Sequence, residues 1–416
     1  MTQCDLLIIG AGPAGMAAAL AAAPSGASIV LIDDNPAPGG QIWRDGPNAQ
    51  VPLAARRMRE QLAGCANVRI HSGARVIAAP DPQTLLLEDA EHGWLLQWKK
   101  LILCTGAREL LLPFPGWTLP GVTGAGGLQA LIKSGLPVAG ERIVVAGSGP
   151  LLLAAALSAH KAGAKVVRIA EQASLLAVLG FAARLVASPA KALQALTLIH
   201  PQYRTSTHVV AVRGQGRVES VQLQQGGNRV DIACDRLACG FGLVPNTQLG
   251  QLLGCSLTPS GLAVDTWQAT SQAGVYAAGE CTGVGGCERA LVQGRIAGLA
   301  AVGDKAAAQK LWPERSRWEA FAQQLARSFA LATQLKELPR ADTLVCRCED
   351  VAYAAIAACE DWTDAKLHTR CGMGACQGRV CGTALQFLRN WEQPVPRNPL
   401  APARIGTLAA SPVKGK

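Results

Sequence analysis

The sequence predicts an α/β protein with two strand–turn–helix–strand units and a small cysteine-rich domain near the C-terminus. Residues 6–32 and 143–171 each contain an apolar strand, a glycine-rich turn, an apolar helix and a second apolar strand. Strands that are apolar on both faces are typical of a central parallel sheet. The third observation is that residues 346–381 hold six of the 14 cysteines.

Composition excludes several classes of protein. With 49% hydrophobic and 16% charged residues in 416, the chain is too apolar to be disordered. The net charge of +10 is not gathered into runs of like charge, which disfavours nucleic-acid binding. Residues 6–32 carry no charge and are long enough to span a bilayer, but glycine and proline interrupt them, so we predict no membrane span. We expect a cytoplasmic protein with reduced cysteines, with peripheral attachment to the inner membrane as the alternative.

The first unit predicts a dinucleotide site. Residues 10–15, Gly-Ala-Gly-Pro-Ala-Gly, follow a strand and open a helix. The first glycine permits the tight turn, the second lets a pyrophosphate approach the backbone, and the third lets the helix pack on the sheet. The helix N-terminus then offers free N–H groups to phosphate. Asp33 ends the second strand, where a carboxylate can bind ribose hydroxyls.

Three further segments resemble the two-dinucleotide-domain flavoproteins of the glutathione-reductase type. They are Gly39-Gly40-Gln41, the strand that ends in Thr105-Gly106, and the strand that ends in Gly279-Glu280. Glu280 stands where that family usually has aspartate. The resemblance implies FAD as the cofactor, held by Gly10, Gly12, Pro13, Ala14, Gly15, Asp33, Asp34, Gly40, Gln41, Val76, Thr105, Gly106, Gly279 and Glu280.

The second unit repeats the first with one difference. Its turn contains Gly147 and Gly149, and its second strand ends at Glu171. Such a unit binds NAD(P)H in the flavoproteins, and an acidic residue at this position favours NAD. Leu152 replaces the third glycine, so we expect poorer helix–strand packing there. Three alternatives therefore remain for this unit. It binds NAD, it binds a different nucleotide, or it is empty, and any nucleotide would be held by Gly147, Gly149 and Glu171.

The chain offers no clear catalytic residue. Disulfide reductases need two nearby cysteines facing the flavin, and none follows Gly40 or forms a Cys-x-x-Cys pair in the second unit. The six histidines carry no motif. The chain therefore resembles electron-carrying machinery, and its catalytic residues stay unassigned.

The C-terminal cysteines predict a metal centre. Cys346-x-Cys348 and Cys376-x4-Cys381 supply four soft thiolates on two loops, which suit an iron–sulfur cluster or zinc. The spacing favours [2Fe-2S], with zinc and no metal as alternatives. Cys371 is a fifth thiol, either a replacement ligand or a bystander.

This segment resembles the bacterioferritin-associated-ferredoxin-like [2Fe-2S] domain. The shared pattern runs Cys-Arg-Cys-Glu and then Thr-Arg-x-Gly-Met-Gly-x-Cys-Gln-Gly-Arg-x-Cys, with Cys371 at the variable position. The resemblance implies that the ligands are Cys346, Cys348, Cys376 and Cys381.

Residues 239–247 and 285–298 extend the likeness over nearly the whole chain. They resemble the alpha subunits of D-hydroxyproline dehydrogenase, octopine and nopaline oxidases, and hydrogen cyanide synthase. The resemblance implies an electron-transfer subunit with FAD and [2Fe-2S]. It also implies a beta subunit similar to D-amino-acid oxidase, FMN at the subunit interface and a small gamma subunit. D-hydroxyproline is the first expectation for the substrate. The alternatives are an opine oxidase or hydrogen cyanide synthase subunit, a self-sufficient NAD(P)H-dependent ferredoxin or acceptor reductase, and a non-catalytic assembly subunit.

These observations predict six segments. We expect the FAD domain in 1–108 and 239–304, the inserted second domain in 118–238, a helical segment in 305–340, the [2Fe-2S] domain in 341–392 and an extended, non-helical tail in 393–416, where proline is frequent.

Overall fold

The computed structural model describes residues 2–185 and 200–409. The chain divides into two compact units, each assembled from separate stretches of sequence. The first unit comprises Met1–Arg108, Pro245–Gln323 and Val395–Lys416, and the second comprises Glu109–Val244 and Gln324–Pro394. The chain passes between units within β7 (Ala107–Glu109) and β16 (Leu243–Pro245). In the part of the chain described, no helix is long and apolar enough to cross a membrane.

The first unit is built on a seven-stranded sheet. Its strand order is β3-β2-β1-β6-β5-β4, and β19 pairs with β6. Neighbouring strands are parallel from β3 to β6 and at β19, whereas β4, β5 and β6 form an antiparallel meander. The strands are β1 (Thr2–Ile9), β2 (Ile29–Asp33), β3 (Val68–Ser72), β4 (Arg75–Asp81), β5 (Thr84–Glu88), β6 (Gly93–Leu103) and β19 (Val275–Ala277).

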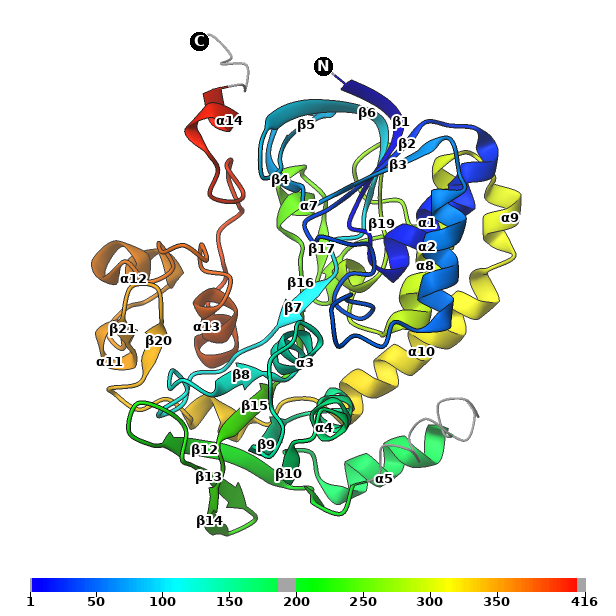
Figure 1. Cartoon of the computed structure of the whole chain (residues 1–416). Coiled ribbons are helices and arrows are strands. Elements are labelled where there is room, and N and C mark those ends of the chain that lie inside the picture. The colour runs from blue at the N-terminus through cyan, green and yellow to red at the C-terminus, as the bar shows by residue number, and fades with distance from the viewer. Residues whose placement is uncertain (1, 186–199, 410–416) are drawn as a thin grey trace. The chain divides into compact units, whose positions relative to one another are not determined.

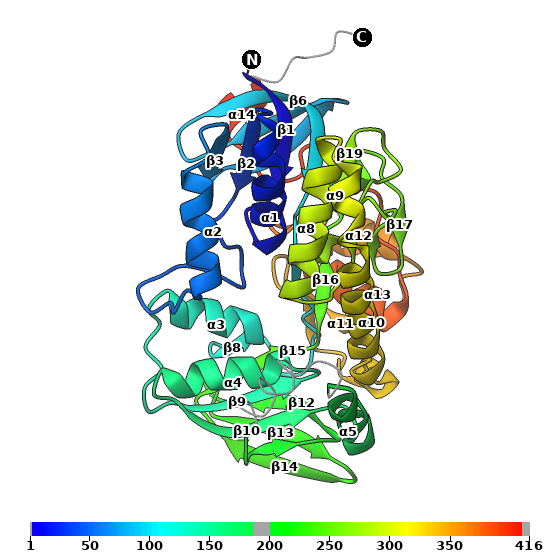
Figure 2. The same cartoon turned by 90° about the vertical axis from the view of Figure 1, so that its right-hand side faces the viewer.

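Two helices pack closely in this unit because glycine faces alanine between them. Helices α1 (Pro13–Ala22) and α8 (Cys287–Ala301) lie side by side (Figures 1 and 2). A Cβ atom at Gly294 would lie 2.1 Å from the Ala14 carbonyl oxygen, and one at Gly298 would lie 2.2 Å from that of Ala18. Larger residues at these glycines would therefore push α8 away from the first turn of α1.

The remaining elements of the first unit are short apart from two helices. They are α2 (Leu53–Ala63), α7 (Gln248–Leu252), α9 (Lys305–Gln309), most of α10 (Trp312–Ser328), β17 (Leu257–Thr258), β18 (Gly261–Leu262), η1 (Ala23–Ser25) and η3 (Glu280–Thr282). Trp318 on α10 is buried against Val292 and Ile296 of α8, and Trp312 and Phe321 pack against the same cluster, so the aromatic residues of α10 serve core packing.

Residues 400–409 pack on the sheet of the first unit. Leu400 N donates to Ile77 O at 2.7 Å. Arg404 donates through its backbone N–H to Glu88, which also pairs with Arg75. The segment then forms the short helix α14 (Ile405–Ala409). This helix differs from the expected non-helical tail, because residues 403–409 contain no proline. Pro412 lies outside the described residues.

The second unit contains a five-stranded parallel sheet in the order β11-β10-β9-β15-β8. Helices α3 (Ala125–Lys133) and α4 (Leu151–Lys161) lie side by side in this unit (Figure 2). The strands are β8 (Val122–Gly124), β9 (Arg142–Gly147), β10 (Lys165–Glu171), β11 (Tyr203–Arg204) and β15 (Arg236–Gly240). Strand β15 continues two residues beyond the limit at 238 expected for this domain.

An antiparallel sheet and helix α5 (Leu175–Arg184) complete this nucleotide-type fold. The sheet consists of β12 (Thr207–Arg213), β13 (Ser220–Gln225) and β14 (Asn228–Ala233). Its inward side chains share a core with the parallel sheet, and Leu335 and Leu338 also belong to this core. Leu335 lies in η4 (Thr333–Glu337).

The cysteine-rich segment has a small core of its own. Trp362 lies in that core together with Cys346, Cys371 and Cys381. The elements are β20 (Leu344–Cys346), β21 (Val351–Ala352), α11 (Tyr353–Ile356), α12 (Trp362–Thr369) and α13 (Cys381–Arg389).

Candidate cofactor sites

The first glycine turn has the geometry that its sequence predicts. Gly10 adopts φ +105°, and a Cβ there would lie 2.2 Å from the Cys104 carbonyl oxygen. A Cβ at Gly15 would lie 1.8 Å from the Gly10 oxygen, so both positions require glycine. Helix α1 begins at Pro13, directly after Gly12. The turn therefore places a helix N-terminus, which favours phosphate, at the end of β1.

Asp33 closes this turn. Its Oδ2 accepts the N–H of Ala11 at 2.5 Å, and its Oδ1 accepts the backbone N–H and side-chain amide of Asn35, each at 2.7 Å. Burial, together with the adjacent Asp33, raises the pKa of Asp34. The structure thus brings the predicted acid onto the glycine turn through specific hydrogen bonds.

Gly40 lies against the turn, whereas Val76 lies in β4. A Cβ at Gly40 would lie 3.0 Å from the Gly12 Cα, so the two backbones meet there. Ala74 N donates to Asp33 O at 2.9 Å, which places Val76 two residues from a backbone contact with the acid. Gln41, by contrast, is exposed to solvent.

Gly279 adjoins the first turn of α1. Gly279 has φ +82°, and a Cβ there would lie 2.8 Å from the Ala14 Cβ. Glu280 Oε1 accepts the N–H of Gly286 at 3.1 Å. Burial raises the pKa of Glu280, and hydrogen bonds from the Gly286 and Gly285 backbones oppose that rise.

Asn246 joins the remaining predicted FAD residues. Thr105 donates through its hydroxyl to Asn246 O at 2.6 Å, and Asn246 Nδ2 donates back to Thr105 O at 2.9 Å. Asn246 N donates to Gly106 O at 2.9 Å. In the sequence Asn246 stands out only as part of a family pattern, because its hydrogen bonds to Thr105 join residues 141 positions apart.

Two buried donors were not predicted as site residues. Gln293 accepts the Gly279 N–H at 2.9 Å, which holds the Gly-Glu turn. Among residues 2–185 and 200–409, Gln293 Nε2 and Arg289 Nε are buried without a hydrogen-bond partner. Such a donor costs about 1–3 kcal/mol unless a ligand satisfies it. These orphaned donors, beside the glycine turns that FAD needs, fit a bound dinucleotide. The only feature of the sequence that could have pointed to Arg289 and Gln293 together is their spacing of one helical turn on α8.

The second glycine turn is closed by its own acid. Glu171 is fully buried and accepts the N–H groups of Gly149 at 2.8 Å and Ala173 at 2.9 Å. Burial raises the pKa of this carboxyl group. Leu152, expected to disturb packing, is fully buried in the core of this fold. The facing residue is Gly240, whose missing side chain leaves room, because a Cβ there would lie 2.9 Å from Leu152 Cδ2.

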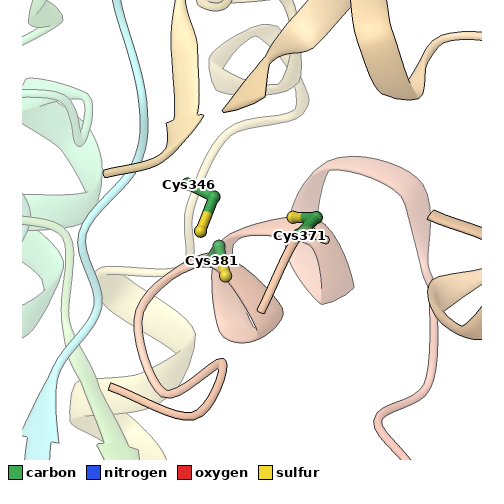
Figure 3. Close-up of side chains that lie close together, drawn as sticks. All are labelled: Cys346, Cys371 and Cys381. Atoms are coloured by element: carbon green, nitrogen blue, oxygen red, sulfur yellow. The ribbon is translucent and has the colours of Figure 1, made fainter. Parts of the chain in front are cut away.

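Three cysteines converge in the C-terminal segment. The Sγ atoms of Cys346, Cys371 and Cys381 all lie within 4.8 Å of one another, and all three residues are buried. They come from β20, the loop after α12 and the start of α13, as Figure 3 shows. Cys371, which sequence reasoning left as a replacement ligand or a bystander, therefore lies with two of the predicted ligands.

The other two predicted ligands form a second pair. Cys348 and Cys376 interact through their side chains. Burial raises the pKa of Cys376, but hydrogen bonds from the Val380 backbone, Cys348 and the Gly378 and Arg379 backbones give a net lowering. Loop N–H groups thus face the Cys376 sulfur atom.

Glycines allow this loop to fold tightly. A Cβ at Gly374 would lie 2.2 Å from the Cys348 Cβ, and one at Gly372 would lie 2.5 Å from the Trp362 ring. Arg370 Nε donates to Glu349 at 2.8 Å, so these two side chains beside the cysteines neutralise each other's charge. The thiols and inward N–H groups are a donor set that suits a thiolate-bound metal centre.

Residues 4–301 match the family described as pyridine nucleotide-disulphide oxidoreductase. The chain belongs to this family. With the glycine turns and acids described above, this makes it a flavin-dependent oxidoreductase that binds FAD. Solved structures share the α/β fold. One is L-proline dehydrogenase from P. horikoshii, with TM-score 0.72, 19% identity, and 98% of this chain and 79% of that chain covered. Another is Lactococcus lactis thioredoxin reductase, with TM-score 0.55, 20% identity, and 75% and 99% covered.

Relatives with higher identity to this oxidoreductase are named as subunits. An opine oxidase subunit from Agrobacterium tumefaciens is 32% identical, with 99% of this chain and 90% of the relative covered. Hydrogen cyanide synthase subunit HcnB from Pseudomonas aeruginosa is 32% identical, with 90% of each covered. Relatedness to subunits of opine oxidase and hydrogen cyanide synthase is thus shown over nearly the full length.

Proposed function

We propose that this flavoprotein is the electron-transfer subunit of a heteromeric amino-acid or imino-acid dehydrogenase, with D-hydroxyproline as the first substrate to test. One observation carries the proposal. A single chain combines an FAD-type fold with a C-terminal segment in which three cysteines converge and two more form a pair, and it is similar to an opine oxidase subunit along both parts. A partner similar to D-amino-acid oxidase would oxidise the C–N bond, and FMN would lie at the interface.

The cysteine site is proposed to hold [2Fe-2S]. Cys346 and Cys381 are close together in the fold, and Cys348 interacts with Cys376. When bound, the cluster supplies a one-electron carrier. The protein's part is to present thiolates from a strand, a glycine-rich loop and a helix start, and to direct N–H groups at them.

The test is anaerobic reduction of the native complex, purified through a tag on this chain. We expect a copurified second flavoprotein chain. We also expect D-hydroxyproline, or another member of a panel containing octopine and glycine, to bleach the flavin absorbance only when that chain is present. Substrate-dependent bleaching of this chain alone would contradict the proposal. Mass analysis of the released flavins tests for FMN.

A stand-alone NAD(P)H-dependent acceptor reductase is the second candidate, favoured by the second glycine turn and Glu171. Catalytic bleaching of the isolated chain by NADH or NADPH would support this candidate against the first.

A further inference from the structure

A segment of the chain's own backbone lies on the second glycine turn. Ser148 is the residue between the two turn glycines, and its hydroxyl donates to the Phe329 carbonyl at 2.9 Å. The Phe329 side chain lies 3.7 Å from where a Cβ at Gly149 would be. All three residues belong to the second unit.

Gln172 holds the same segment from the end of β10. Its amide Nε2 donates to the Ala330 carbonyl at 2.9 Å and to Ser148 Oγ at 3.0 Å. Its Oε1 accepts the N–H of Ala332 at 3.1 Å. Gln172 and Ser148 are both buried, so these bonds are made away from solvent. Four hydrogen bonds thus involve the turn, the residue after Glu171 and the segment 329–332.

Apolar contacts anchor the segment at both ends. The Phe329 ring packs edge-on against the ring of Phe181 of α5, with centroids 5.2 Å apart. Leu335 and Leu338, which follow the segment, are buried in the core beneath the parallel sheet. Because the flanking residues belong to a packed core, releasing the segment would expose apolar surface.

A dinucleotide needs the space that this segment fills. The second glycine of such a turn lets the pyrophosphate approach the backbone, and the turn N–H groups bind it. Here the phenyl group of Phe329 lies over that glycine. The bonds from Glu171 to the turn do not distinguish the two folds, because Asp33 makes the same kind of bonds in the first one; the covering segment does.

We propose that the second dinucleotide fold is occupied by residues 329–332 of the same chain, so that it binds no dinucleotide and NAD(P)H is not the electron source of this oxidoreductase. The inference goes beyond the proposed function, because it concerns a fold that the electron-transfer role does not use. The proposal also argues against the stand-alone NAD(P)H-dependent reductase, which would need a nucleotide in this fold.

Nucleotide binding is measured by equilibrium dialysis on the full chain saturated with FAD, which blocks the first site. NADH, NADPH and ATP are the probes. We expect no saturable binding with a dissociation constant below about 1 mM, the weak end of ordinary substrate affinity. Saturable micromolar binding of any probe that Gly149→Val abolishes would overturn the proposal. Failure of this proposal can be told apart from failure of the proposed function, because the dialysis uses neither a partner subunit nor an amino-acid substrate.

Amide hydrogen exchange tests the contact itself. Gln172→Ala removes the acceptor of the Ala332 N–H, so exchange at Ala332 should accelerate roughly tenfold, the usual effect of one lost hydrogen bond. The matched control is Gln334→Ala, which removes an exposed glutamine two residues after the segment and should leave exchange at Ala332 unchanged. Unchanged exchange in Gln172→Ala would show that the segment is not held on the turn, which would overturn the proposal.

Discussion

The carboxylate of Asp33 accepts the backbone N–H of Ala11 at 2.5 Å, which ties the end of β2 to the glycine turn after β1. Glu171 makes a related bond to Gly149 N at 2.8 Å in the second fold. In both folds an acid at a strand end fixes the turn before any ligand binds. The two folds differ in what lies over the turn, since Phe329 contacts only the second one.

Asp33→Asn should release FAD. Both carboxylate oxygens accept hydrogen bonds from N–H groups, so an amide NH₂ would face a donor on one side. We expect a loss of about 1–3 kcal/mol in the free energy of unfolding and at least a tenfold weaker FAD affinity. Flavin-to-protein ratio and urea unfolding measure these effects. Asp45→Asn, which alters a half-exposed carboxylate that pairs with Arg59 and accepts the Gly46 N–H, is the control. Equal flavin content in both variants would contradict the role of Asp33.

Gly279→Ala should abolish FAD binding, and Gly26→Ala should not. The two glycines have almost the same positive φ, +82° and +78°. An added Cβ at Gly279 would collide with the Ala14 Cβ at 2.8 Å, whereas Gly26 has nothing within 4 Å. Gly26→Ala should therefore cost only the backbone strain, about 1–2 kcal/mol. Thermal unfolding and bound flavin separate the two effects, and a flavin-replete Gly279→Ala variant would count against this site.

Single cysteine substitutions should distinguish the proposed cluster ligands from the neighbouring thiol of Cys371. Cys376→Ser should lower bound iron and the visible cluster spectrum strongly, because the resemblance assigns Cys376 as a ligand. Cys371→Ser should retain the cluster. Since the Cys371 thiol lies within 4.8 Å of those of Cys346 and Cys381, it is placed to substitute partly for a lost ligand, and the double variant should lose any residual iron.

Metal analysis of each variant checks the cysteine prediction. Cys359→Ser is the control, because Cys359 lies in the same core but outside the thiol group. Loss of iron in Cys371→Ser with full iron in Cys376→Ser would reverse the ligand assignment. Finding zinc in place of iron would show that the cysteines form a structural zinc site and not a [2Fe-2S] cluster.

Glu88 should make the first unit acid-labile. Burial raises the pKa of Glu88, but hydrogen bonds from Arg75, the Arg404 backbone and Thr407 outweigh it and lower the pKa from 4.5 to about 2. A lowered carboxyl pKa contributes stability above the unfolded value, and that stability is lost as pH falls from about 4.5 through about 2.

Unfolding free energies measured between pH 6 and pH 2 test this prediction. In Glu88→Gln the acid limb, meaning the fall in unfolding free energy as pH decreases towards 2, should be flatter. The same substitution should speed proteolysis of the C-terminal segment, because Arg404 of that segment bonds to Glu88. Glu91→Gln on the same hairpin, with an 81% exposed side chain, should behave like the unsubstituted chain. An unchanged acid limb in Glu88→Gln would contradict the prediction.

The sequence by itself determined the two strand–turn–helix–strand units and the acids at Asp33 and Glu171. These depend on local periodicity and on glycine conformations, which short stretches encode. It also indicated the thiol-rich segment. The contacts of Asn246 with Thr105, and of Gln293 with Gly279, were beyond its reach, because they join residues far apart in the chain.

Only the tertiary structure decided what surrounds each turn and each thiol. Leu152 predicted poor packing, yet Gly240, 88 positions away, leaves the space that it fills. Cys371 joined Cys346 and Cys381 because packing on Trp362 sets the path of the loop. Phe329 reached the second turn because Leu335 and Leu338 fix the following residues in the core. Such placements arise from the packing of distant apolar side chains, which local patterns do not encode.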